Sequence, residues 1–183
     1  MLKRALILAL AGAALAPVAQ AALATGAAAP DFTAPAFLAG QPFTFKLAEA
    51  LKKGPVVVYF FPAAHTKGCN IEAHLFAEAA DQFKAQGASI IGVTAGNTDQ
   101  LGAFSKETEY CSGKFPVAAD STGAIAKSYD STLILRPGWS DRTSYVIAPS
   151  GKIILSYSDL KPDDHVGKTL AALKQFNAAK KAS

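Results

Sequence analysis

Six consecutive apolar residues, Val56 to Phe61, limit how this chain can fold more than any other feature of its sequence. A continuous run of β-branched and aromatic side chains is typical of a strand that is buried on both faces. Such strands occur in parallel or mixed sheets that helices cover on both sides. Ser89 to Thr94 has the same character and predicts a second buried strand. The sequence therefore predicts an α/β domain.

The segments around these two strands alternate between strand and helix patterns. Thr25 to Gln41 is rich in Ala, Pro and Gly and predicts an irregular segment laid over the domain. Apolar residues after Cys69 recur at helical spacing as far as Gly87. The remaining predictions are a strand near Phe43 and Phe45, helices over 47–51, 98–110 and 124–129, a short strand edge over 115–119, a hairpin over 143–157 and a last helix after Pro162.

This order predicts a thioredoxin-like fold, in which a mixed central β-sheet lies between helices on both faces as an αβα sandwich. Residues 22–183, about 160 residues, fit a single domain with its own core. Residues 1–21 predict a cleaved signal peptide, because Lys3 and Arg4 precede an apolar run and Ala19-Gln20-Ala21 is a small-x-small cleavage pattern. We therefore expect a periplasmic or otherwise exported protein with no membrane attachment after cleavage.

The charge of the predicted mature chain argues against a nucleic-acid partner. Two of the 18 basic residues lie in the leader, so its removal lowers the net charge from +4 to +2. The basic residues near the C-terminus are more simply explained as a solvated tail.

Cys69 stands just after the first buried strand, in the first turn of the helix that follows. The backbone N–H groups at a helix start have no partners within the helix and favour an anion. A thiol at that position is expected to form the thiolate, which is the nucleophilic form. By position alone, an inert buried cysteine explains Cys69 equally well.

The segment from Pro62 to Cys69 has the spacing Pro-x-x-x-Thr-x-x-Cys, which resembles the active-site motif of the peroxiredoxins. The likeness extends over nearly the whole predicted mature chain and is most similar to the bacterioferritin-comigratory, or peroxiredoxin Q, branch. It is carried by Tyr59-Phe60-Phe61, Glu72-Ala73, Gly92-Val93-Thr94, Phe115-Pro116 with Asp120, and Arg142 to Ile147. The resemblance implies a thioredoxin-dependent thiol peroxidase that reduces hydrogen peroxide and organic hydroperoxides without a cofactor.

The resemblance also implies roles for individual residues. Cys69 would attack the peroxide, Pro62 would shape the loop and shield the thiolate, and the Thr66 hydroxyl would hydrogen-bond the peroxide. Arg142 would place a fixed positive charge beside the sulfur. Arg136 competes for that role, but Arg142 directly precedes a strand and so has the more rigid support. Glu72 fits either hydrogen bonding around the site or a favourable acid in the first turn of a helix.

Cys111 is the one other cysteine, and the resemblance implies that it resolves the sulfenic acid on Cys69 as an intramolecular disulfide. The branch often carries this second cysteine five residues after the first, where this chain has His74. Because a disulfide requires close Cα atoms, we expect local unwinding near Cys69, near Cys111 or at both. A permanent bridge, or cysteines that never meet, are the alternatives.

Two other functions on the same fold stay open from the sequence. A disulfide carrier would ordinarily have Cys-x-x-Cys, which the chain lacks. A copper-binding redox module would use Cys69 with His65 or His74, but this spacing is a weak metal signature and surface histidines explain it better. For the peroxidase, the expected partners are a hydroperoxide and a thioredoxin-like reductant, and a monomer is expected because the branch is often monomeric.

Overall fold

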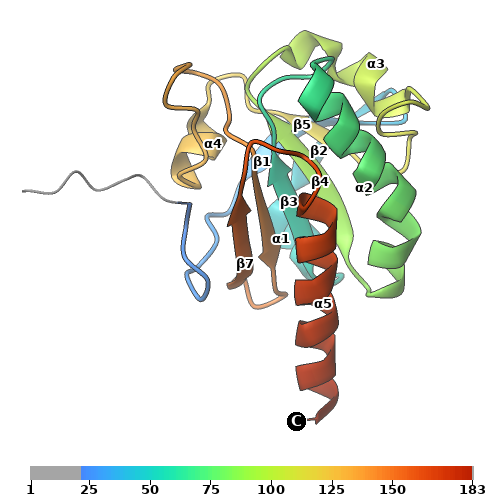
Figure 1. The fold of residues 1–183 in the computed structure, drawn as a ribbon, viewed down its shortest axis with the longest axis vertical. Helices are drawn as coiled ribbons and strands as arrows, with labels where there is room; N and C mark the ends of the chain where they lie inside the picture. Colours follow the sequence, from blue (N-terminus) through green and yellow to red (C-terminus); the bar gives the residue numbers. More distant parts are fainter. Residues whose placement is uncertain (1–21, 183) are drawn as a thin grey trace, which may run out of the picture.

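The computed structural model describes residues 22–182, and the predicted signal peptide lies outside them. A seven-stranded sheet runs through the domain with helices packed on both sides (Figure 1). Its elements are β1 (Thr33–Leu38), β2 (Gln41–Lys46), α1 (Leu47–Leu51), β3 (Val56–Phe60), α2 (Lys67–Ala85), β4 (Ser89–Thr94), a 3-10 turn (Thr98–Gln100), α3 (Leu101–Lys106), β5 (Val117–Ala119), α4 (Ala124–Ser128), β6 (Thr143–Ile147), β7 (Ile153–Ser158) and α5 (His165–Ala182).

The sheet is mixed, with the strand order β2-β1-β5-β4-β3-β6-β7. Strand β3 pairs in parallel with β4 and antiparallel with β6, and β4 pairs in parallel with β5. All five residues of β3 are buried, as its apolar run predicts, although β4 rather than β3 is the middle strand. The mixed sheet between two layers of helices confirms the predicted thioredoxin-like fold class.

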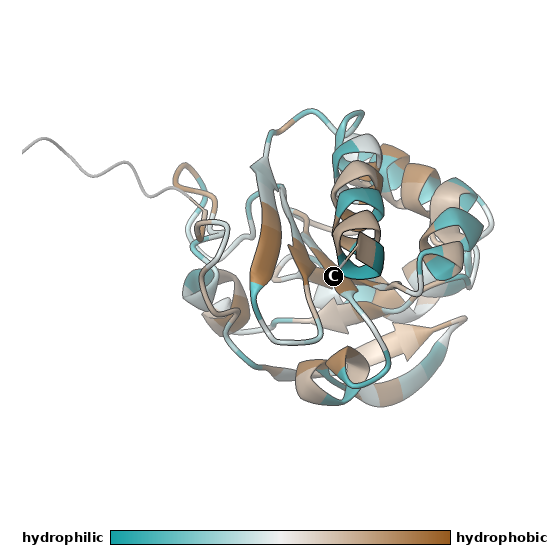
Figure 2. Cartoon of the chain, turned by 90° about the horizontal axis from the view of Figure 1, so that it is seen from below, coloured by the Kyte–Doolittle hydropathy of each residue, from teal (hydrophilic) through white to brown (hydrophobic). Residues whose placement is uncertain are grey.

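Alternate side chains of β3 enter two separate hydrophobic cores. Val57 and Tyr59 point into the core shared with α2, α3 and α5. Val58 and Phe60 point into the core shared with α1, α4 and β6. Figure 2, seen from below, shows hydrophobic strands lying between the helices on the two sides of the sheet. Burial on both faces therefore fixes β3 rigidly, and the loop that follows it inherits a fixed starting point.

Residues 33–38 correct one prediction, because they form a strand where an irregular segment was expected. The middle of β1 is Ala-Pro-Ala, which carries no strand pattern. Its two buried side chains are the small ones of Ala34 and Ala36, and Phe37 packs partly buried against the other core. A two-residue turn at Ala39 (φ 51°) and Gly40 (φ 80°) joins β1 to β2 as a hairpin.

Two further predictions are wrong in their details. β5 was expected as a short strand edge, but it pairs with both β1 and β4 inside the sheet. The helix expected to reach Tyr110 ends at Lys106, and Glu107 is extended (φ −63°, ψ 128°). Cys111 therefore lies in a turn rather than at a helix end. Among the described helices, none is long and apolar enough to cross a membrane.

Candidate active site

The loop after β3 places Cys69 in the first turn of α2. Thr66 occupies the N-cap position with extended backbone (φ −106°, ψ 146°), and α2 begins at Lys67. The Thr66 hydroxyl does not cap the helix but donates a hydrogen bond to the Ala63 carbonyl oxygen at 2.9 Å. Cys69 is 1% exposed. The sulfur thus lies at the start of a helix, as predicted, but beneath the surface in this conformation.

Contacts with the end of β4 hold this loop in place. The Thr94 hydroxyl donates to the Pro62 carbonyl oxygen at 3.0 Å, and the Asn97 side-chain amide donates to the Ala64 carbonyl oxygen at 2.9 Å. Gly96 packs so closely that a Cβ there would lie 2.4 Å from the Pro62 oxygen. Pro62 therefore sits in a loop that begins at the end of β3 and is held by the end of β4 and the residues after it.

Arg142 lies directly beside Cys69. Thr143 pairs with Phe60, so the residue that precedes β6 stands next to the end of β3, where the active loop begins. The Arg142 Nη2 atom donates to the Cys69 Sγ atom at 3.5 Å, and its Nε donates to the Leu160 carbonyl oxygen at 2.8 Å. Arg142 is only 4% exposed. Its charge is therefore felt by the sulfur with little screening by water.

Gly68 makes this approach possible. A Cβ at Gly68 would lie 2.9 Å from Arg142 Nη2, which is closer than real Cβ contacts come. The competing Arg136 instead lies over the Trp139 ring, 3.4 Å from the ring centroid. The structure thus brings together Cys69 and Arg142 and engages Arg136 elsewhere.

Glu72 completes the group around the guanidinium. Its carboxylate oxygen Oε2 accepts a short hydrogen bond from Arg142 Nη1, and the side chain is fully buried. Burial raises the pKa of Glu72 to about 8, although the neighbouring Arg142 acts in the opposite direction. Of the two interpretations that the sequence leaves open, the structure shows the first, hydrogen bonding within the site.

A buried histidine lies behind Glu72. His165 Nδ1 is 3.5 Å from Glu72 Oε1 and 2.8 Å from the Ser144 hydroxyl, while Nε2 is 2.9 Å from the Asp159 carbonyl oxygen. Sequence reasoning missed His165. The spacing along α5 could have indicated that His165 is buried. It lies four residues before Thr169 and five before Leu170, and all three are buried.

Cys111 lies in the same hydrophobic core as Cys69, and both are free thiols in this structure. It is fully buried in the turn that follows α3, ahead of Ser112 (φ 56°) and Gly113 (φ 65°). Burial, with the nearby Glu107 adding to it, raises the pKa of the Cys111 thiol. Cys111 therefore needs a local change in structure before it can react as a thiolate.

His65 links the active loop to the Cys111 segment. Its ring nitrogens contact Gln100 Oε1 at 2.7 Å and Glu107 Oε2 at 3.1 Å. The ring also packs edge-on against Phe104 and Tyr110. His65 is thus more than the surface histidine that the sequence suggested. Residues 22–182 contain no group of three or more His, Cys, Asp or Glu side chains placed to hold a metal ion.

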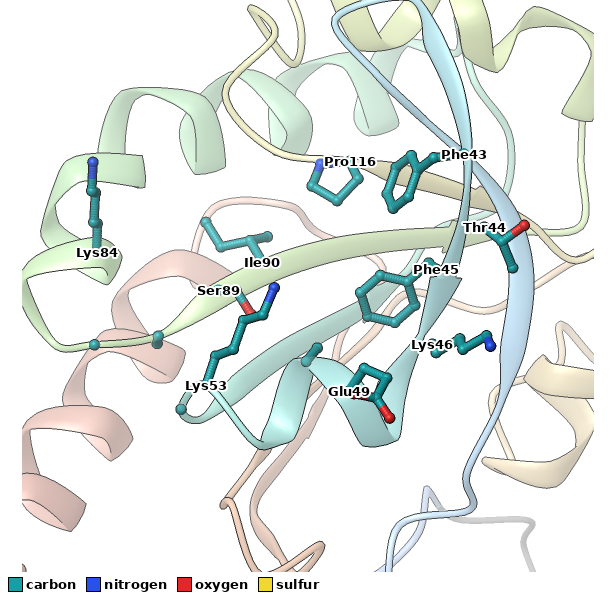
Figure 3. A pocket seen from close by; sticks show the side chains of 14 residues that line it. Phe43, Thr44, Phe45, Lys46, Glu49, Lys53, Lys84, Ser89, Ile90 and Pro116 are labelled. Carbon is teal, nitrogen blue, oxygen red and sulfur yellow. The ribbon is translucent and has the colours of Figure 1, made fainter.

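A cavity of about 760 Å³ lies near the starts of β3 and β4, whereas Cys69 follows the end of β3. Figure 3 shows the side chains that line this cavity. Side chains of β2, α1 and the start of β4 line it, among them Phe43, Phe45 and Ile90, together with Lys53 after α1, Lys84 near the end of α2 and Pro116 before β5. Neither cysteine is part of this cavity, so it is separate from the candidate active site.

The chain is similar to known proteins over most of its length. Residues 25–156 match the sequence pattern of the AhpC/TSA family. Chloroplastic peroxiredoxin Q of Sedum lineare is 29% identical over 143 residues, covering 74% of this chain and 75% of the plant protein. Chloroplastic peroxiredoxin Q of Populus jackii is 30% identical over 126 residues, covering 68% of this chain and 58% of that protein. The crystal structure of peroxidoxin BcpB from Mycobacterium tuberculosis superimposes with a TM-score of 0.72 at 29% identity, covering 82% of this chain and 96% of the other.

The chain therefore belongs to the AhpC/TSA family, and it is an enzyme of the thiol-dependent peroxidase class. Within that family, its relatives place it in the peroxiredoxin Q, or bacterioferritin-comigratory, branch.

Proposed function

We propose that Cys69 is the residue that reduces hydrogen peroxide or an organic hydroperoxide, with Arg142 holding the reacting atoms. The contact between Arg142 Nη2 and Cys69 Sγ at 3.5 Å carries this proposal, because it joins a fixed cation to the one sulfur that stands at a helix start. A thiolate is the form that attacks peroxides, and both neighbours favour an anion.

The sulfur attacks the distal peroxide oxygen, so that an S–O bond forms as the O–O bond breaks. Cys69 becomes a sulfenic acid, and the departing oxygen takes a proton to become water or an alcohol. Arg142 Nη1 and Nη2 each carry a second N–H beyond the ones that contact Glu72 and Cys69, and these donors would stabilise the negative charge that develops on the departing oxygen. Thr66 and Pro62, held in the loop, orient the peroxide for this attack.

Cys111 then attacks the sulfenic sulfur, forming the disulfide and releasing water. Both sulfurs are buried, so this step requires the first turn of α2, the turn around Cys111 or both to open. The turn around Cys111 is the easier of the two to open, because the preceding helix α3 is short and the two residues after Cys111 have left-handed backbone. A thioredoxin-like protein would reduce the disulfide and restore both thiols.

The wider setting follows from the sequence. We propose that residues 1–21 direct export and are removed, and that the remaining domain, residues 22–183, acts as a monomer in the periplasm or an equivalent compartment. Peroxide and a thioredoxin-like reductant are its partners, and the catalytic cycle uses no cofactor.

Peroxide consumption by purified protein with a thioredoxin system tests the assignment. Cys69→Ser is expected to abolish consumption, and Cys111→Ser to allow one turnover before stalling. Intact-mass measurement after one equivalent of peroxide should show a loss of about 2 Da only when both thiols are present. Unchanged consumption by Cys69→Ser would refute the assignment of the attacking sulfur.

A further inference from the structure

Two acidic groups share one buried cation in this site. Arg142 donates from Nη2 to Cys69 and from Nη1 to Glu72, while its Nε is occupied by the Leu160 carbonyl oxygen. Within residues 22–182, Glu72 forms ion pairs with no cation other than Arg142, unless the His165 ring is protonated. A thiolate and a carboxylate together would leave a net negative charge buried, which is strongly unfavourable.

The hydrogen bonds of His165 show where a compensating proton fits. The Asp159 carbonyl oxygen only accepts, so His165 Nε2 must carry a hydrogen to donate to it at 2.9 Å. In the neutral ring, Nδ1 is then an acceptor, and it receives the Ser144 hydroxyl hydrogen at 2.8 Å. Glu72 Oε1, buried 3.5 Å from Nδ1, is left without any hydrogen-bond partner. An additional proton on Oε1 would satisfy this orphaned atom, with the single Nδ1 lone pair then shared between that proton and the Ser144 hydroxyl.

The surroundings favour the carboxyl as the main holder of that proton. Burial raises the pKa of Glu72 and lowers the pKa of His165, and Arg142 further disfavours a charge on the ring. The aspartates near the ring act in the other direction. The charged and titratable groups that face the pair are Arg142 before β6, Cys69 and Glu72 itself on α2, Tyr59 on β3, Tyr157 on β7, and Asp159 and Asp164 before α5.

We propose that Glu72 is the proton store of the active site: its carboxyl, supported by His165, holds a proton while Cys69 is a thiolate and releases it when the sulfur becomes neutral. Glu72 contacts Arg142 and not the reacting atoms, so it is a positioning residue rather than a catalytic one, and the proton that it releases is exchanged with the departing oxygen through solvent. The inference rests on Cys69 being the reacting sulfur, as proposed above.

The store accounts for the proton that peroxide reduction consumes. Thiolate, hydroperoxide and protonated Glu72 become sulfenic acid, alcohol and ionised Glu72. The S–O bond forms, the O–O bond breaks, the sulfur is oxidised, the peroxide is reduced, and the departing oxygen ends with the proton. Before the reaction Arg142 is balanced by the thiolate, and afterwards by the carboxylate. The net charge of the buried site therefore does not change.

Infrared difference spectroscopy in the Cys111→Ser background tests this proposal directly. Cys69 is made neutral by iodoacetamide in one sample and by one equivalent of peroxide in another. Both spectra should lose a carboxylic-acid C=O band and gain carboxylate bands. Glu72→Gln should remove this signal, whereas the exposed His74→Gln should leave it unchanged. An alkylation spectrum without the band, or a band that survives Glu72→Gln in either spectrum, overturns the proposal.

His165→Gln tests the part played by the ring. The glutamine amide can still donate to the Asp159 oxygen and accept from Ser144, but it offers a different partner to Glu72. The C=O band should therefore shift in frequency. An unshifted band would show that His165 does not support the proton.

The pH dependence of Cys69 alkylation supplies a second readout. Two coupled acids titrate in two macroscopic steps, so the wild-type site in the Cys111→Ser background should give a two-step rate profile. Glu72→Gln should give a single step, because the carboxyl no longer competes with the thiol for Arg142. A single-proton wild-type curve contradicts the proposal.

Since alkylation requires no peroxide, a band in the alkylation spectrum with none in the peroxide spectrum would refute the catalytic assignment and leave the proton store intact.

Discussion

Arg142 Nη2 lies 3.5 Å from Cys69 Sγ, although 73 residues separate the two in the sequence. The antiparallel pairing of β3 with β6 brings these distant segments together, since Phe60 faces Thr143. The guanidinium therefore depends for its position on the sheet and on the Glu72 and Leu160 contacts, rather than on a mobile loop.

Replacing Arg142 by lysine should greatly reduce peroxide reduction. Lysine keeps the charge but cannot bridge Cys69, Glu72 and Leu160 with a planar set of donors. We expect the second-order rate with hydrogen peroxide to fall by about 10²- to 10³-fold. Stopped-flow kinetics measure this rate, and Arg136→Lys is the matched control because that side chain lies over Trp139. A wild-type rate in Arg142→Lys would argue against a role for the guanidinium.

Gly68→Ala should impair the same contact without changing any charge. The new Cβ would lie 2.9 Å from Arg142 Nη2, so the guanidinium must move away from the sulfur. We expect at least a tenfold loss of rate, or about 1.4 kcal/mol of transition-state stabilisation. Gly167→Ala in α5 is the control, because a Cβ there meets nothing within 4 Å. That control should keep full activity and gain about 0.5–1 kcal/mol of stability. Equal activity in both variants would count against the steric argument.

His65→Ala should loosen the segment that carries Cys111. The substitution removes the contacts with Gln100 and Glu107 and the ring packing against Phe104 and Tyr110. We expect faster hydrogen exchange over residues 107–113 and faster disulfide formation after oxidation, with a loss of about 1 kcal/mol in global stability. Exchange measured by mass spectrometry reports the first effect. Unaltered exchange in this segment would show that His65 does not restrain it.

The ionisation of Glu72 should make stability fall as the pH rises. Its folded pKa is raised from 4.5 to about 8, so the protonated form is favoured by folding. The associated stability is fully present below the unfolded pKa and is lost as the pH rises through the folded value. The free energy of unfolding of the wild type, relative to Glu72→Gln, should therefore decrease between pH 4.5 and 8. Urea titrations across this range measure the difference, and a constant difference would mean that Glu72 has an ordinary pKa.

The sequence predicts the buried strands of this fold better than it predicts β1, its hairpin turn and the end of α3. Val56 to Phe61 and Ser89 to Thr94 are recognisable because burial on both faces makes them apolar, except for Ser89 and Thr94 at the two ends of the second strand. β1 escapes because Ala34, Pro35 and Ala36 carry no strand signal of their own, and its hairpin turn has only one glycine. The break after Lys106 is equally hidden, because Glu107 to Tyr110 could continue a helix by local propensity.

The candidate site divides in a similar way. Cys69 is identifiable from the spacing of the Pro62 to Cys69 motif and Arg142 from the resemblance to the peroxiredoxins, and the structure places the two in contact. The functions of Glu72 and His165 depend on tertiary contacts between α2 and α5, which no local pattern encodes. Glu72 lies three residues after Cys69 and thus on the same helix face, so its burial could be inferred once that face was known to point inward.

Trapping the oxidised sulfur tests the central claim most directly. Cys111→Ser protein treated with one equivalent of hydrogen peroxide in the presence of dimedone should carry a single adduct, located on Cys69 by peptide mass spectrometry. The account predicts that this adduct forms rapidly in Cys111→Ser and much more slowly when Arg142→Lys is added. An adduct that maps elsewhere, or none at all while peroxide is still consumed, would contradict it.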